Sequence, residues 1–152
     1  MVKEPDPILA PESPRLIAVE SGGLYVVMDV TREGRVRLIH FDAVPFDAAA
    51  YDPAAYHKYY TLLELHGIGE DIDDHHGSRH TYTGPAVRLR YVSHGLEPVP
   101  GGRILSIHLT DGALWVTVRW RFYDGAAVVR CETEVENRGE TPFILDYITS
   151  FA

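Results

Sequence analysis

The sequence predicts an all-β domain in which two antiparallel sheets pack face to face. Apolar and polar side chains alternate along successive short segments, so each predicted strand has one apolar face. Glycine-containing turns of hairpin length separate these segments. The chain has 152 residues, 45% of them hydrophobic, which is enough apolar side chain for one continuous core. About nine or more strands with one apolar face each need a second layer to cover them, and stacked sheets provide it.

The N-terminal segment, residues 1–15, is charged and rich in proline and predicts a flexible tail ahead of a sandwich that spans residues 16–152. A signal peptide would be apolar here, and no run approaches the roughly 18 to 20 apolar residues that cross a bilayer. The 22 acidic and 14 basic residues give a net charge of −8, which repels phosphate backbones and anionic lipids. We therefore expect a cytoplasmic protein that binds neither nucleic acid nor membranes.

Three strands open the predicted sandwich. Residues 16–20 and 24–30 alternate on either side of the turn Ser21-Gly22-Gly23. A turn at residues 31–34 then leads into a strand at residues 35–41. The lengths of both gaps favour hairpins, so neighbouring strands should pair in antiparallel fashion.

At most one short helix is expected, near residues 53–59. Asp52 is suited to cap a helix whose first residue is Pro53, because aspartate accepts a backbone N–H and proline lacks one. Residues 60–65 could extend this helix, but two glycines follow soon after and favour a strand.

The second half of the chain predicts long strands. Val87, Leu89 and Tyr91 alternate with arginines, and residues 104–110 lead into the hairpin turn Asp111-Gly112. The next strand has the inward row Leu114, Val116, Val118, Trp120 and Phe122. The strand after it has the inward row Val129, Cys131, Thr133 and Val135.

The end of the chain predicts a second hairpin at residues 137–139 and a strand-like run over residues 143–152. Because this run stops on apolar residues without a polar tail, we expect the chain to be the N-terminal part of a longer polypeptide. Cys131, the single cysteine, cannot form an internal disulfide, and its alternating apolar surroundings predict a buried small side chain rather than a nucleophile.

Trp115 and Trp120 have opposite parity on one predicted strand, so they cannot both face the core. The tryptophan that faces outward could stack on a sugar ring or anchor an interface with another domain.

The richest group of polar side chains lies between residues 71 and 80. It consists of Asp71, Asp73, Asp74, His75, His76, Arg79 and His80. His76 and His80 have the spacing of two metal ligands on a helix, but the nearby glycines oppose a helix, and the spacing of a calcium loop is absent. The remaining interpretations are a hydrogen-bonded loop at a domain or subunit contact and direct contact with a sugar. No catalytic residue, metal ion or cofactor is predicted, because nucleophile elbows and phosphate-binding glycine loops are missing too.

Four stretches carry a resemblance to a known family. They are Leu63-Glu64-Leu65 leading to Gly69-Glu70-Asp71, the run from Asp73 to His80, the phrase Leu89-Arg90-Tyr91-Val92-Ser93-His94, and Val135-Glu136-Asn137-Arg138-Gly139. In this order they resemble the N-terminal β-sandwich domain of family 36 glycoside hydrolases, the bacterial α-galactosidases.

The resemblance implies a two-sheet supersandwich, similar to that of galactose mutarotase, that precedes a catalytic barrel. Hydrolysis in the family is retaining and uses two aspartates of that barrel, neither of which maps onto this chain. In oligomeric members a loop of the sandwich reaches the sugar pocket of a neighbouring subunit, and by position this loop is residues 45–59. The candidates for sugar binding or interface contact are Asp47, Asp52, Asp73, Asp74, His75, His76, Arg79 and Trp115.

The implied function is that of a non-catalytic sandwich domain. It would support the missing C-terminal catalytic barrel and the homo-oligomer of an enzyme that acts on α-galactosides. Two alternatives stay open. One is a free-standing carbohydrate-binding module that uses an exposed tryptophan, and the other is a mutarotase-like enzyme in which His94 or His108 serves as the base.

Overall fold

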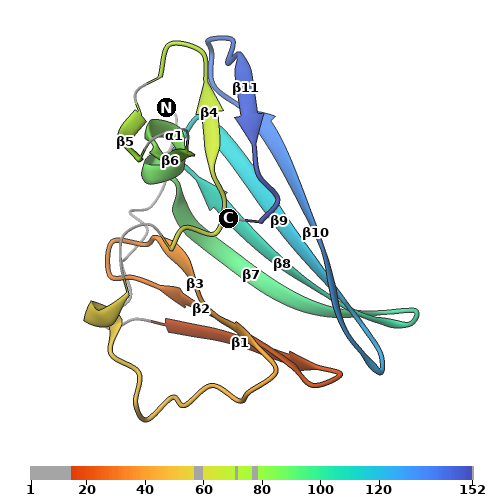
Figure 1. Ribbon diagram of the computed structural model, residues 1–152. Coiled ribbons are helices and arrows are strands. Elements are labelled where there is room, and N and C mark those ends of the chain that lie inside the picture. Colours follow the sequence, from red (N-terminus) through yellow and green to blue (C-terminus); the bar gives the residue numbers. More distant parts are fainter. Residues whose placement is uncertain (1–14, 57–59, 71, 77–78, 152) are drawn as a thin grey trace, which may run out of the picture.

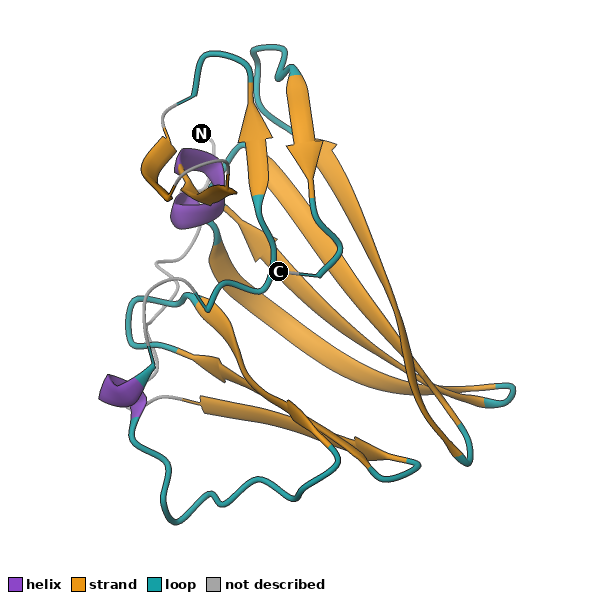
Figure 2. Ribbon diagram, viewed as in Figure 1, coloured by secondary structure: helices purple, strands orange, loops and turns teal. Residues whose placement is uncertain are grey.

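The structure, a computed structural model, describes residues 15–151 apart from 57–59, 71 and 77–78, and of residues 72–76 and 79–81 it describes the backbone alone. The predicted tail therefore lies outside the described residues, except for Arg15, which begins the first strand. Strands dominate the described chain (Figure 2), and the predicted all-β class is confirmed. The helical segments in this part of the chain lack the length and hydrophobicity of a membrane span.

The larger sheet has four antiparallel strands in the order β10-β9-β8-β7. They are β7 (Arg90–Val99), β8 (Gly102–Thr110), β9 (Leu114–Tyr123) and β10 (Ala126–Asn137). Along β9 the side chains alternate between buried and half-buried. The inward row predicted from the alternation is at most 3% exposed: Leu114, Val116, Val118, Trp120 and Phe122.

The smaller sheet has the order β1-β2-β3 and lies across the inner face of the larger one (Figure 1). Its strands are β1 (Arg15–Ser21), β2 (Leu24–Val30) and β3 (Val36–Asp42). The main core fills the space between the two sheets, because each contributes its apolar face. Among the residues that meet there are Ile17, Val26, Met28, Leu105, Ile107 and Val118.

Short elements cover one end of the sandwich (Figure 1). Strand β4 (Leu65–Gly67) pairs antiparallel with β11 (Leu145–Ile148), and β5 (Ile72–His76) pairs antiparallel with β6 (Arg79–Thr83). The 3-10 turn η1 (Pro53–Ala55) and the helix α1 (Gly84–Arg88) lie between strands in the chain.

The helix α1 corrects the prediction, which allowed a helix only near residues 53–59. The alternation through Val87 predicted a strand there, but β7 starts at Arg90. Pro85 occupies the first turn of α1, where its missing N–H costs nothing, and the Leu89 amide donates to the Pro85 carbonyl at 3.2 Å. Leu89 is buried at the end of this turn. The apolar spacing is therefore satisfied without a strand.

Residues 60–65 also differ from the predicted strand. Thr61 forms only an isolated bridge, to Arg37, and β4 begins at Leu65. The neighbours Leu62 and Leu63 are both buried, whereas neighbours in a regular strand point to opposite faces. The segment is irregular because both leucines enter the core.

The turn predicted at residues 137–139 forms, but it does not make a hairpin. The Asn137 Oδ1 atom accepts the Gly139 amide at 2.9 Å, and the Arg138 amide donates to the Ala113 carbonyl at 2.8 Å. The second contact directs the chain across the end of the β8–β9 hairpin. The next strand, β11, consequently pairs with β4 and not with β10.

Two adjacent glycines in the β1–β2 turn give a matched stability test. Both have positive φ, but a Cβ on Gly22 would lie 2.5 Å from the Ala126 carbonyl carbon, whereas a Cβ on Gly23 would meet nothing within 4 Å. We expect Gly23→Ala to cost about 1 kcal/mol of unfolding free energy, and Gly22→Ala about 2–4 kcal/mol because of the added clash. Urea denaturation measures both. Equal losses would mean that the β1–β2 turn does not press against β10.

Candidate functional site

A buried ion pair stands at the base of the loop between β3 and η1. Asp29 of β2 and Arg37 of β3 are direct cross-strand partners, and the Asp29 side chain is completely buried. The Arg37 Nε atom donates to Asp29 Oδ1 at 2.9 Å, and a second guanidinium nitrogen donates to Oδ2. The hydrogen bond with Asp29 raises the pKa of Arg37, so the guanidinium keeps its charge.

This pair holds the anchored loop, which we define as residues 43–56. The Tyr51 hydroxyl donates to Asp29 Oδ2 at 2.6 Å, and Arg37 donates to the Tyr56 carbonyl at 2.8 Å and to the Pro53 carbonyl at 3.2 Å. Burial and the Asp29 carboxylate raise the pKa of Tyr51, so its phenol keeps the proton that it donates. The loop runs outside the sheets (Figure 1), yet three of its residues are tied to one buried pair.

Aromatic rings line the same loop. Phe46 lies 5.4 Å from the ring of His40 and 6.0 Å from that of Tyr51. Tyr56 lies 5.9 Å from Tyr51 and 5.9 Å from Tyr60. Such tilted and edge-on contacts are favourable arrangements for aromatic pairs, and they order the loop further.

The two predicted loop carboxylates, Asp47 and Asp52, are exposed on the anchored loop. Asp47 Oδ1 accepts the Ala49 amide at 2.9 Å, and Asp52 Oδ1 accepts the Ala54 amide at 2.9 Å. Asp52 thereby caps η1, which confirms the short helix expected near residues 53–59 as a single 3-10 turn. The described hydrogen bonds of both carboxylates use Oδ1 alone. Each side chain is held in place by these bonds, and among the described residues its second oxygen has no hydrogen-bond partner.

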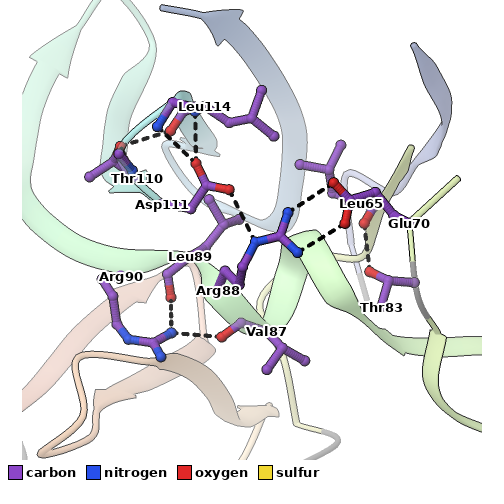
Figure 3. A network of polar contacts seen from close by, with 12 residues as sticks. Leu65, Glu70, Thr83, Val87, Arg88, Leu89, Arg90, Thr110, Asp111 and Leu114 are labelled. Carbon is purple, nitrogen blue, oxygen red and sulfur yellow. Dashed lines mark hydrogen bonds and ion pairs between the residues drawn. The ribbon is translucent and has the colours of Figure 1, made fainter. Parts of the chain in front are cut away.

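A polar network that sequence reasoning missed ties α1 to the turn between β8 and β9 (Figure 3). Arg88 forms a two-pronged ion pair with Glu70 at 2.9 and 3.1 Å, and its Nε lies 3.5 Å from Asp111. Asp111 Oδ1 in turn accepts the Leu114 amide at 2.8 Å. The three charges lie far apart in the sequence, so no local pattern could have brought them together.

A buried carboxylate, Glu64, holds β6 against the segment that leads into β4. It accepts the amides of Tyr82 at 2.8 Å and Thr83 at 3.2 Å, together with the hydroxyls of Thr61 at 3.0 Å and Thr83 at 3.1 Å. Its environment is therefore made of hydrogen-bond donors, which explains how a carboxylate can be buried there. Glu64 belongs to a stretch that carried the family resemblance, and its role here is structural.

Comparison with known proteins relates this architecture to one enzyme family. No family model matches the chain, and no curated protein matches its sequence. Among solved structures, a variant of the GH36 α-galactosidase AgaA from Geobacillus stearothermophilus in complex with raffinose matches with a TM-score of 0.58 and 20% identity, over 82% of this chain and 22% of the enzyme. The GH36 α-galactosidase AgaB from the same organism matches with a TM-score of 0.56 and 18% identity, over 91% of this chain and 23% of the enzyme.

The chain has the fold of one part of a GH36 α-galactosidase. The likeness expected from the four sequence stretches is thus confirmed at the level of fold. The chain spans less than a quarter of the length of the α-galactosidases it matches, because the aligned part covers 22–23% of them.

Of the predicted polar group at residues 71–80, residues 72–76 and 79–80 fall on the β5–β6 pair of this α-galactosidase-like fold, whereas Asp71 and residues 77–78 lie outside the described residues. The backbones of His75 and His80 are direct partners, as are those of His76 and Arg79. The two histidines of the predicted spacing thus lie on paired strands, which removes the helical arrangement considered for them. The side chains of Asp73, Asp74, His75, His76 and Arg79 lie outside the described residues.

Trp115 and Trp120 divide as their parity predicts. Trp120 is completely buried, whereas Trp115 is half-buried on the outer face of the four-stranded sheet. The guanidinium of Arg138 lies 4.3 Å from the centre of the Trp115 ring. This cation–π contact occupies a ring face on which a sugar would have to stack. Trp115 lies on β9 of the four-stranded sheet, whereas Asp47 and Asp52 lie on the anchored loop, which follows β3 of the three-stranded sheet.

The two histidines considered for mutarotase-like chemistry face opposite sides of the sheet. His94 is paired with Ile107 and Ser93 with His108, and neighbouring strand residues alternate between faces. The Tyr91 hydroxyl lies 2.8 Å from His94 Nδ1, while His108 lies 3.2 Å from the Thr117 hydroxyl on the outer face. A sugar bound on either face of the sheet could therefore meet only one of these two candidate bases.

Cys131 is half-buried and not fully buried as the alternation predicts, because β10 is the outermost strand of its sheet among the described residues. Burial raises the pKa of its thiol to about 11. We expect the rate of alkylation by iodoacetamide to rise about tenfold per pH unit from pH 8 to pH 10, because the reactive thiolate is still a minor species there. A plateau near pH 9 would contradict the raised pKa.

Proposed function

We propose that this chain is a non-catalytic N-terminal sandwich domain of an α-galactosidase-like glycoside hydrolase. The observation that carries the proposal is the match in fold, which takes in 82–91% of this chain but only 22–23% of the enzymes. A domain of this kind would support the catalytic barrel and the oligomer while the barrel performs the hydrolysis. The anchored loop would help to shape the sugar pocket.

The chemistry of the anchored loop supports this role. Asp47 and Asp52 are exposed carboxylates whose orientation is set by their own backbone hydrogen bonds. A carboxylate can accept hydrogen bonds from adjacent sugar hydroxyls, and a loop tied to the Asp29–Arg37 pair loses little conformational freedom when a sugar binds. The cation–π contact between Arg138 and Trp115 argues against the alternative of a carbohydrate-binding module built on Trp115.

The test uses the complete polypeptide encoded by the gene and an aryl α-galactoside as substrate. The complete polypeptide should hydrolyse it, and the 152-residue chain alone should not. A hydrogen bond to a charged group is worth about 1.5–3 kcal/mol, so Asp47→Ala or Asp52→Ala should raise KM about 10- to 100-fold with little change in kcat. Asp124→Ala, in the exposed β9–β10 turn, is the matched control and should change neither constant.

Two outcomes would refute the proposal. Hydrolysis by the 152-residue chain alone would place the catalytic centre in this domain. A complete polypeptide without activity on α-galactosides would remove the assignment to this class of hydrolase. If both loop variants behave like Asp124→Ala, the domain would support the enzyme without contributing to its sugar pocket.

A further inference from the structure

The inward side of β10 is less well covered than the inward side of its neighbour β9. On β9 the inward residues Val116, Val118 and Trp120 are at most 1% exposed. Their cross-strand partners on β10, Val135, Thr133 and Cys131, are only half-buried although they face the same side of the sheet. An edge strand with an inward apolar row needs a second layer above it, just as its neighbour does.

Two exposed aromatic side chains lie at the border of this uncovered region. Phe41 at the end of β3 is 42% exposed, and Phe151 is 46% exposed. Their ring centres are 5.4 Å apart, and Phe151 stacks on buried Trp120 at 5.5 Å. The edge face, as we name this surface, consists of Phe41, Val129, Cys131, Val135 and Phe151.

The opposite side of β10 has a different character. Its outward residues are Arg130, Glu132, Glu134 and Glu136, all exposed. Arg119 on the neighbouring strand pairs with Glu134 at 2.7 Å, as expected of a surface in water. Only the inward side of this strand is suited to an apolar partner.

We propose that the edge face is covered by the polypeptide that follows residue 152 in the same protein, which forms a further part of the second layer over β10. This inference rests on the proposed function, in which the chain is one domain of a longer hydrolase. The matched enzymes are much longer than the aligned part, which makes up 22–23% of them. Phe151 already lies on the edge face, so a continuing chain starts beside the surface that it covers.

Cys131 serves as a reporter because it lies in the edge face. Iodoacetamide labelling, followed by peptide mass spectrometry, gives the alkylation rate of Cys131 in the 152-residue chain and in the complete polypeptide. For each polypeptide, the protection factor is the alkylation rate in concentrated urea divided by the rate in the folded state. We expect this protection factor to be at least tenfold larger in the complete polypeptide. The matched control is Cys131→Ala combined with Glu134→Cys, which puts the thiol on the outward side of the same strand and should show the same protection in both polypeptides.

Three results would overturn the inference. The first is equal protection of Cys131 in the two polypeptides. The second is an equal rise in protection at positions 131 and 134, which would mean that the inward side is not specifically covered. The third is protection in the 152-residue chain that rises with its concentration, which would identify a second copy as the occupant. Should the isolated chain fail to fold, the comparison of positions 131 and 134 within the complete polypeptide decides, with at least tenfold greater protection expected at 131.

Aryl α-galactoside hydrolysis is measured on the same complete polypeptide, so the two proposals can fail separately. An active enzyme with an unprotected Cys131 would refute the covered edge face and leave the proposed function standing. An inactive polypeptide with a protected Cys131 would refute the proposed function alone.

Discussion

Replacing Trp120 with alanine is expected to lower the free energy of unfolding by about 3–5 kcal/mol, among the largest effects of any single substitution in this chain. The side chain is completely buried in the middle of β9, next to Leu105 of β8 and Cys131 of β10. Its removal would leave a large cavity between the two sheets and take away the surface on which Phe151 stacks. Urea denaturation, with the slope compared between variants, measures the loss.

Trp115→Ala is the matched control for this substitution. It removes the same side chain from the same strand, but from the outer face, where Trp115 is half-buried and contacts Arg138. We expect a loss of about 1 kcal/mol or less, the size of an exposed cation–π contact. Equal losses for the two tryptophans would contradict the assignment of the inner and outer faces of β9.

Arg37→Met is expected to cost about 3–5 kcal/mol, because it leaves the Asp29 carboxylate buried without its cation. It also removes the donors to the Tyr56 and Pro53 carbonyls, so the anchored loop should come loose. Urea denaturation gives the stability, and hydrogen exchange of the amides of residues 43–56 gives the ordering of the loop. Exchange there should accelerate more than in β8 and β9.

The double variant Asp29→Leu with Arg37→Met separates the two effects. Removing both charges relieves the uncompensated burial, so much of the stability should return. The loop amides should remain fast, since the double variant lacks both the Asp29 acceptor of the Tyr51 hydroxyl and the Arg37 donor to the Tyr56 carbonyl. Recovery of slow exchange in the double variant would show that the aromatic contacts alone hold the loop.

The Asp29–Arg37 pair shows how far a sequence pattern reaches. Alternation along residues 24–30 puts Asp29 on the face opposite Val26 and Met28. A carboxylate on the face away from the core is expected to be exposed to solvent. The structure buries it completely because Tyr51 and the loop cover that face. The sequence contains one indication of this cover, because Val27 on the same outward face is apolar. In the structure Val27 is only 3% exposed. A strand that is apolar on both faces indicates cover on both faces.

A bulge in β3 escaped prediction for a related reason. Val27 pairs with His40 and Met28 with Leu38, so Ile39 is an extra residue between them. The extra residue shifts the alternation by one position and turns Phe41 toward Trp120. Simple alternation from Val36 would have sent Phe41 outward, away from the edge face.

Local sequence patterns were enough to predict the all-β class, most strand positions, the inward row of β9, the cap at Asp52 and the likeness in fold to GH36 α-galactosidases. These follow from local chemistry, since alternation, turn residues and capping act over a few neighbouring positions. Three other features depend on contacts between distant parts of the chain: β11 pairs with β4, Arg88 joins Glu70 to Asp111, and Asp29 is buried under the loop. Alternation along a strand predicts which of its faces is apolar. Which segment covers that face depends on packing between residues far apart in the chain.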